Sequence, residues 1–292
     1  MIHTRLGFFA LILLLASGTA FAQTDSSALR KEDPPIPVEE IIKKFADKEK
    51  QFKEARANYV YRQDVMIQEL NANDRVVGEY RLVSDILFDE KNRRTERIVR
   101  APQPTLQGIQ VTSQDLQDIR DIQPFVLTSD DIQKYKLSYV GKEKIDEVDS
   151  YVFDVEPKVI EKGQRYFQGR IWVDDVDSQI VKTYGKAVPD IRDDKGNENL
   201  FPRFETYREQ IDDYWFPTYT RAVDTLNFST GAKRIRQVIR YENYRKFVAD
   251  VKLTFGDAVE GETAGKAGTA PSGKAPALDP KLDQKTKKKK NN

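Results

Sequence analysis

The pattern of apolar and polar residues changes its period near Asn58. Between Val38 and about Arg56, apolar residues recur three or four positions apart with charged residues between them, which predicts an amphipathic helix. Pro37 is a typical residue at the start of a helix. The charged remainder of the helix is expected to face water. The apolar stripe consists of Ile41, Phe45, Phe52 and Ala55.

After Asn58 the apolar residues alternate with polar ones, as they do in strands with one buried face. Turn sequences such as Asn71 to Asp74 and Ser229 to Gly231 separate many of these segments. Strands joined by short loops pair antiparallel, so the pattern predicts an antiparallel meander. The expected strands are 59–70, 76–88, 94–99, 134–140, 151–156, 164–173, 179–186, 203–211, 214–226 and 233–246.

The middle of the chain interrupts this pattern. Residues 111–117 (VTSQDLQ) resemble residues 127–133 (LTSDDIQ), and each segment has a Thr followed three positions later by an Asp. This spacing is typical of a helix capping box. We expect two short helices that start alike; a duplicated unit is the alternative. In both cases, these helices are expected to cover the apolar face of the sheet as a lid.

The two ends of the chain differ from its body. Residues 1–22 combine one early positive charge, an apolar run from Leu6 to Leu15 and the triplet Ala20-Phe21-Ala22, which predicts a secretory signal peptide cleaved after Ala22. Residues 23–37 form a polar linker with three prolines. Residues 38–256 are the expected folded domain. Residues 257–292, rich in Gly, Ala, Pro and Lys, are expected to be a disordered tail.

Composition excludes much chemistry. The chain has no Cys, and its one His is His3, inside the predicted signal peptide. The mature protein therefore lacks thiolate nucleophiles, disulfides, His general bases and zinc sites built on Cys or His. The formal net charge is +1, and it becomes about 0 without Arg5; the tail has eight lysines and five acids, which leaves the body at about −3. A mildly acidic body is a poor nucleic-acid ligand.

Two charged clusters are candidate sites. Asp174, Asp175 and Asp177 have spacing compatible with a calcium loop, but they lack the Gly and the bidentate Glu of such a loop, and a strand-ending turn is the favoured interpretation. Residues 91–100 carry five basic residues, which indicate a solvated strand face or a contact with a lipid headgroup or anionic partner. A hydrolase built on paired carboxylates is a further alternative, although no pair stands out.

The apolar face of the sheet is the strongest functional signal. The chain has 13 Tyr, 15 Phe and 2 Trp although 33% of its residues are charged, and the aromatic residues fall repeatedly on the apolar parity of the strands. One helix and two short ones cannot cover a ten-stranded sheet. Apolar surface left uncovered on a soluble protein indicates a ligand or a partner.

Two strand motifs carry a resemblance. Residues 151–157 (YVFDVEP) are followed by residues 166–174 (YFQGRIWVD) and then by 178–182 (SQIVK). A strand ending in Pro, a variable loop and a strand with Gly-x-Ile-Trp-Val-Asp resemble the periplasmic lipoprotein-carrier superfamily. Its members include LolA-like outer-membrane lipoprotein-sorting proteins, LolB, LppX and the RseB/MucB stress sensors. The similarity spans roughly residues 38–247.

This resemblance implies a mainly β fold with helices (α+β): an antiparallel half-open β-barrel with an N-terminal helix and short lid helices over the concave face. It implies a monomeric periplasmic protein without enzymatic activity, cofactor or metal. Its partners would be lipoprotein or lipid acyl chains and a transfer partner in the inner or outer membrane. Three alternatives stay open: an envelope-stress sensor that binds lipid or unfolded outer-membrane protein, a transmembrane β-barrel, and the carboxylate hydrolase.

The expected ligand-contacting residues are the inward-facing ones of each strand, together with two from the lid. An error of one residue in parity moves a whole strand's set to the other face. The predicted lipid-binding residues are Tyr80, Leu82, Ile86, Phe88, Leu116, Ile119, Phe153, Ile171, Val173, Phe204, Tyr219 and Ile239.

Overall fold

The computed structural model of the chain describes residues 28–88, 93–194 and 196–247. The predicted signal peptide and tail lie outside these residues, as does the beginning of the predicted linker. Among the described residues, no helix has the length and apolar character needed to span a bilayer.

Ten strands form one antiparallel sheet, and the period-two segments of the sequence are these strands. The β1 and β2 bounds coincide with the predicted ones, and the others differ by a few residues at their ends. The strands are β1 (Tyr59–Leu70), β2 (Val76–Phe88), β3 (Arg94–Arg100), β4 (Tyr135–Ile145), β5 (Val148–Pro157), β6 (Tyr166–Asp174), β7 (Ile180–Val188), β10 (Phe204–Ile211), β11 (Tyr214–Phe228) and β12 (Gly231–Lys246). A separate two-stranded pair, β8 (Ile191–Arg192) and β9 (Glu198–Asn199), lies in the loop before β10.

The order of the strands is not that of a simple meander. It runs β3-β2-β1-β12-β11-β10-β7-β6-β5-β4, so the first strand of the chain pairs with the last. Strands β3 and β4 therefore lie at opposite edges of the sheet, although they follow each other in sequence. The connection between them, residues 101–134, must travel from one edge to the other. It carries helix α2 (Ser113–Asp121) across one face of the sheet.

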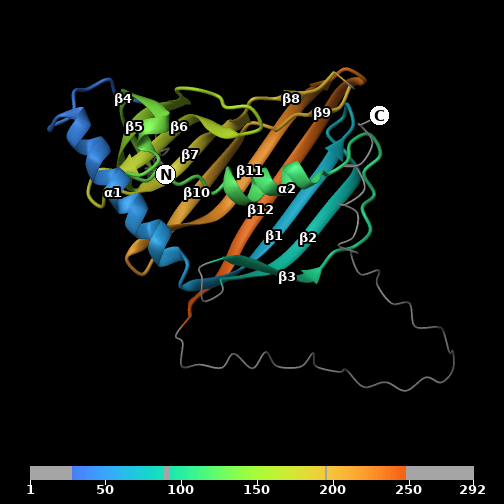
Figure 1. Cartoon of the computed structure of the whole chain (residues 1–292), viewed down its shortest axis with the longest axis horizontal. Coiled ribbons are helices and arrows are strands. Elements are labelled where there is room, and N and C mark those ends of the chain that lie inside the picture. The colour runs from blue at the N-terminus through green and yellow to red at the C-terminus, as the bar shows by residue number, and fades with distance from the viewer. Residues whose placement is uncertain (1–27, 89–92, 195, 248–292) are drawn as a thin grey trace, which may run out of the picture. The chain divides into compact units, whose positions relative to one another are not determined.

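We call the face that α1 (Val38–Arg56) and α2 cover the inner face (Figure 1). The open sheet with helices on this one face is the predicted half-open barrel, of the α+β class. Within the described residues the two edge strands, β3 and β4, do not pair with each other, so the barrel is not closed.

Helix α1 has the predicted bounds and buries the predicted stripe. Ile41, Phe45 and Phe52 are fully buried, and the Phe45 ring lies 5.7 Å from that of Phe153 in β5. One expectation is wrong, however. Glu49 does not face water. It is buried against the sheet, where its carboxylate forms an ion pair with Arg208 of β10, with 2.9 Å between Oε1 and Nη1.

The two expected short helices are one helix and one turn. Thr112 caps α2 through the predicted box, in which its side chain accepts from the Asp115 backbone and Asp115 accepts from the Thr112 backbone. The second segment forms only the 3₁₀ turn η1 (Ile132–Lys134). In this turn the Thr128 hydroxyl donates to Asp131 at 3.0 Å. The same sequence signal yields a turn here and not a helix, because too few residues follow before β4 begins.

Candidate functional site

A pocket lies between α2 and the strands β1, β2 and β3. Its volume is about 380 Å³, which is within the range typical of small-ligand sites, roughly 300–1,000 Å³. Val65 pairs with Leu82 across β1 and β2 and with Ile239 across β1 and β12, so these three residues share the inner face. The lining residues are Gln63, Val65, Leu82, Arg94, Glu96, Ser113, Leu116, Gln117, Ile119 and Arg120. We call this space the α2 pocket.

The α2 pocket has both apolar and charged walls. The apolar part comes from Val65 and Leu82 in the sheet and from Leu116 and Ile119 in the helix. The charged part comes from β3 and from the end of α2. Arg94 donates to Gln63 at 3.0 Å and to Glu96 at 3.3 Å. This arrangement suits an amphipathic ligand, because the apolar wall accepts hydrocarbon while charged groups remain for a polar end.

A second, smaller pocket lies on the other side of Ile119, which lines both. Its volume is only about 60 Å³, room for roughly two water molecules. Its walls are mainly apolar and come from Ile67 of β1, from the segment before α2, from residues 198–202 and from the ends of β11 and β12. As the structure stands, this pocket is too small for an alkyl chain.

Helix α2 separates the two pockets and is lightly packed. Only Asp118 and Ile119 of its nine residues are buried. Polar contacts hold its first turn: Asn199 donates to Thr112 at 3.0 Å and to Asp115 at 2.8 Å. After its end, Gln123 donates to Gln237 of β12 at 2.6 Å. Displacing α2 therefore costs a few hydrogen bonds and little apolar burial, which is what a lid requires.

The buried residue Asp118 faces Arg165, the residue before β6. The Asp118 Oδ2 and Arg165 Nε atoms are 3.6 Å apart, and both side chains are almost fully buried. Neither atom has a hydrogen-bond partner among the described residues. Burial raises the pKa of Asp118 to about 6, and the Arg165 charge opposes this rise only in part. The contact between α2 and the residue before β6 thus leaves two buried charged groups without a direct hydrogen bond between them.

The predicted site residues separate into groups. Leu82, Leu116 and Ile119 line the α2 pocket. Tyr80 is half-buried against the main core, and Phe88 is half-buried at the end of β2. Ile86 is fully buried. The remaining inward-facing residues are fully buried in the core that α1 closes, and none of them lines the α2 pocket or the smaller pocket beside it: Phe153, Ile171, Val173, Phe204 and Ile239.

Tyr219 lies on the outer face, so the parity predicted for it is wrong. It pairs with Arg240 of β12, whereas the neighbouring Thr220 pairs with the inner-face residue Ile239. The cause is a register shift between the Tyr207–Tyr219 and Arg208–Pro217 pairs, which leaves one extra residue in β11. Such a bulge reverses the alternation of side chains on either side of it.

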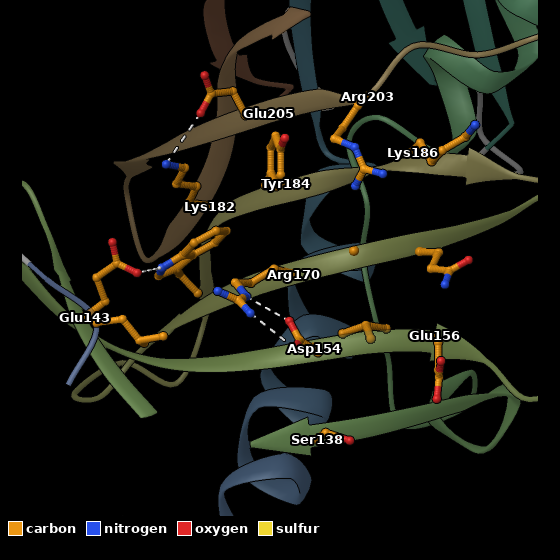
Figure 2. Close-up of a pocket in the computed structure, with 15 residues that line it drawn as sticks. Ser138, Glu143, Asp154, Glu156, Arg170, Lys182, Tyr184, Lys186, Arg203 and Glu205 are labelled. Atoms are coloured by element: carbon orange, nitrogen blue, oxygen red, sulfur yellow. Dashed lines mark hydrogen bonds and ion pairs between the residues drawn. The ribbon is translucent and has the colours of Figure 1, made fainter. Parts of the chain in front are cut away.

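A further hollow, with a volume of about 1060 Å³, lies on the outer face over β4 to β7 and β10. Figure 2 shows that charged and polar side chains dominate it. Asp154 accepts from Arg170 at 2.8 and 3.2 Å, and Glu143 accepts from the Trp172 indole at 2.9 Å. Inserting hydrocarbon here would desolvate these charges at a cost of several kcal/mol each. This hollow is therefore not the apolar site.

Sequence reasoning missed the polar half of the α2 pocket. Gln63, Ser113 and Gln117 gave no signal, since polar residues at these positions are equally typical of solvent-facing sites. Arg94 was part of the predicted basic cluster, but its place at a pocket depends on the 3.0 Å contact with Gln63. The aspartate cluster forms the favoured turn: Asp174 accepts from the backbone of Val176 and Asp177. No cluster suited to a metal ion occurs among the described residues.

Comparison with known proteins gave matches in solved structures only. No family model matches the chain, and no curated protein matches it. A DUF1329 family protein from Desulfovibrio piger is 16% identical over 75% of this chain and 95% of that one, with a TM-score of 0.38. A putative outer membrane lipoprotein-sorting protein domain from Vibrio parahaemolyticus is 15% identical over 74% and 95%, with a TM-score of 0.32. A LolA superfamily protein from Nitrosomonas europaea is 14% identical over 76% and 98%, with a TM-score of 0.33.

The chain's own geometry defines its class: an open ten-stranded antiparallel sheet with one long helix closing half of its inner face and a short helix covering the other half.

Proposed function

We propose that this protein is a periplasmic binding protein that holds an acyl chain, of a lipoprotein or of another lipid, in the α2 pocket. The supporting observation is that the inner face is filled beneath α1 but keeps a space of about 380 Å³ beneath the lightly packed α2. Such a carrier works by burial and release, so it needs no catalytic group. The apolar walls from Leu82, Leu116 and Ile119 are the parts that contact the chain.

The size of the pocket sets the scale of the binding energy. At roughly 30 Å³ for a group the size of a water molecule, a space of about 380 Å³ accepts on the order of ten methylene groups. Each buried methylene contributes about 0.8 kcal/mol, which gives roughly 8 kcal/mol in total. The loss of translational and rotational freedom offsets a large part of this, about 4 kcal/mol or more. The roughly 4 kcal/mol that remains corresponds to a dissociation constant of about a millimolar for a single chain, weak enough for release to a partner.

The test uses the full mature protein and the fluorescent fatty acid cis-parinaric acid. Saturable fluorescence enhancement is expected for the wild type. Leu82→Trp fills the pocket and should weaken binding about tenfold or more. Leu87→Trp is the matched control, because Leu87 is a half-buried leucine of the same strand on the opposite parity. It should bind like the wild type.

Two failures are distinguishable. If the wild type neither binds cis-parinaric acid nor carries lipid in native mass spectrometry after gentle purification, the proposed function is wrong. If it binds but Leu82→Trp and Leu87→Trp behave alike, acyl chains bind at another site. The location is tested separately: N-terminal sequencing of the protein from a periplasmic fraction should begin at Gln23, and intact residues 1–22 would contradict it.

A further inference from the structure

Strand β3 is an edge of the sheet with an open side. It pairs with β2 from Arg94 to Arg100, and no other strand of the described residues pairs with its second side. Six of its seven residues are exposed. Ile98 keeps 63% and Val99 keeps 47% of its surface exposed. The opposite edge is different, because Arg30 forms a backbone bridge with Lys142 of β4 and covers part of it.

The surroundings of this edge are strongly basic. Asp85 on β2 accepts from Arg62 at 2.9 Å and from Arg97 at 2.6 Å, so one carboxylate serves two guanidinium groups. Glu96 is the only acid of β3 itself, and it lies beside Arg94. Strand β3 itself therefore carries three arginines, Arg94, Arg97 and Arg100, against this one acid.

We propose that β3 is a docking edge for an acidic, extended polypeptide segment of a partner protein, which adds to the sheet as a further strand. A strand that joins an edge satisfies the open row of backbone N–H and C=O groups. Carboxylates on that segment lie opposite the arginines, where opposite charges across two strands stabilise the pair. The exposed side chains of Ile98 and Val99 supply apolar contacts to the added strand.

A second copy of this chain fits the edge poorly. When two β3 strands pair antiparallel about Arg97, that residue opposes its own copy and Arg94 opposes Arg100 of the other chain. Like charges directly opposite each other are destabilising. Edge charges of this kind protect a protein against self-association, yet they leave the edge open to a strand of opposite charge. The arginines thus select the partner instead of blocking the edge altogether.

A membrane surface also fits less well than a strand. Ile98 pairs with the inner-face residue Ser84 and Arg100 pairs with Val83, so Val99 is an extra residue at a register shift in this edge strand. Anionic headgroups would also leave the open backbone row unpaired. A polypeptide strand uses the charges, both aliphatic side chains and the backbone together.

The probe is a fluorescein-labelled peptide of seven residues that alternates glutamate and valine, matched to the seven residues of β3. Fluorescence anisotropy at low salt measures its binding to the full mature protein. Three comparisons isolate the mechanism: a peptide with lysine in place of glutamate, the acidic peptide with alternate backbone nitrogens methylated, and phosphatidylglycerol vesicles. We expect binding of the unmodified acidic peptide alone, together with slower hydrogen exchange of the β3 amides when it is bound.

Arg100→Glu should weaken this binding about fivefold, since one favourable cross-strand charge pair becomes a repulsive one. Arg245→Glu is the control, an exposed arginine on β12, which is separated from β3 by two strands. Equal effects of the two variants, equal binding of the methylated or lysine peptide, or vesicle binding without peptide binding would each overturn the proposal. Unchanged β3 hydrogen exchange in the wild type would do so without any variant. Arg100 does not line the α2 pocket, so this test and that of the pocket fail independently.

Discussion

The ion pair between Glu49 and Arg208 offers the sharpest test of how α1 is held on the sheet. Both side chains are almost completely buried. Arg208 donates to the two Glu49 oxygens at 2.9, 3.2 and 3.3 Å, and it also donates to the Phe125 carbonyl. Glu49 accepts from the Ile180 backbone at 3.1 Å. Helix α1, β10, β7 and the segment after α2 therefore meet at this ion pair.

Glu49→Ala removes this carboxylate and leaves the guanidinium buried without its counter-charge. Breaking a buried ion pair in this way costs about 3–5 kcal/mol. The Ile180 N–H also loses its acceptor, which adds about 1 kcal/mol or more. We expect the free energy of unfolding to fall by about 5 kcal/mol in total. At roughly 2–4 °C per kcal/mol for a domain of about 200 residues, the melting temperature falls by roughly 10–20 °C.

Urea unfolding followed by circular dichroism measures the change. Glu40→Ala is the control on the same helix, because Glu40 forms an exposed ion pair with Lys44 that contributes less than about 1 kcal/mol. A double variant, Glu49→Leu with Arg208→Met, replaces the pair by apolar side chains. Its loss in free energy of unfolding should be smaller than the summed losses of the two single variants, by about 2 kcal/mol or more.

Two results would refute this reasoning. A loss for Glu49→Ala no larger than that for Glu40→Ala would mean that water or another group compensates Arg208. Additive losses in the double variant would mean that the two side chains do not stabilise each other, whatever their distance.

Three further predictions concern the lid and the sheet. The pKa of Asp118 is about 6 in the folded state against a usual 3.8, so the folded state binds the extra proton between these values, and the free energy of unfolding falls as pH rises from about 4 to about 6. Relative to Asp118→Asn, the wild type should lose roughly 2–3 kcal/mol across this range in urea titrations; a parallel pH dependence of both proteins would contradict the raised pKa. Thr112→Ala removes the α2 cap and should cost about 1 kcal/mol, with faster hydrogen exchange confined to α2, whereas Thr112→Ser should restore it. Gly78→Ala places a methyl group against the backbone of Thr105 and Leu106 and should cost about 1–3 kcal/mol by thermal melting; an unchanged melting temperature would show that this segment yields freely.

Local patterns sufficed for the elements of this fold. The bounds of α1, β1 and β2 are those that the sequence predicts, because helical spacing, strand alternation and turn residues act within a few positions of each other. The capping box at Thr112 is correct for the same reason. The ten strand segments, and the antiparallel pairing of those strands that short turns connect, follow from the same local signals.

Contacts between distant residues decided the rest. No local pattern shows that β1 pairs with β12, and this pairing is what sends residues 101–134 across the inner face as a lid. The burial of Glu49 depends on Arg208, 159 positions later in the chain. A single extra residue in β11 moves Tyr219 to the outer face, since one residue is half of the strand period.

The sequence by itself therefore determined which segments are helix or strand and that their apolar faces need cover, because those properties arise from neighbouring residues. Only the tertiary structure decided where that cover is complete. Beneath α1, long aromatic side chains from both layers fill the space between helix and sheet; beneath α2, a nine-residue helix with few large apolar side chains leaves it open. Whether a cavity remains depends on the summed volumes of residues far apart in the chain, and no local pattern encodes that sum.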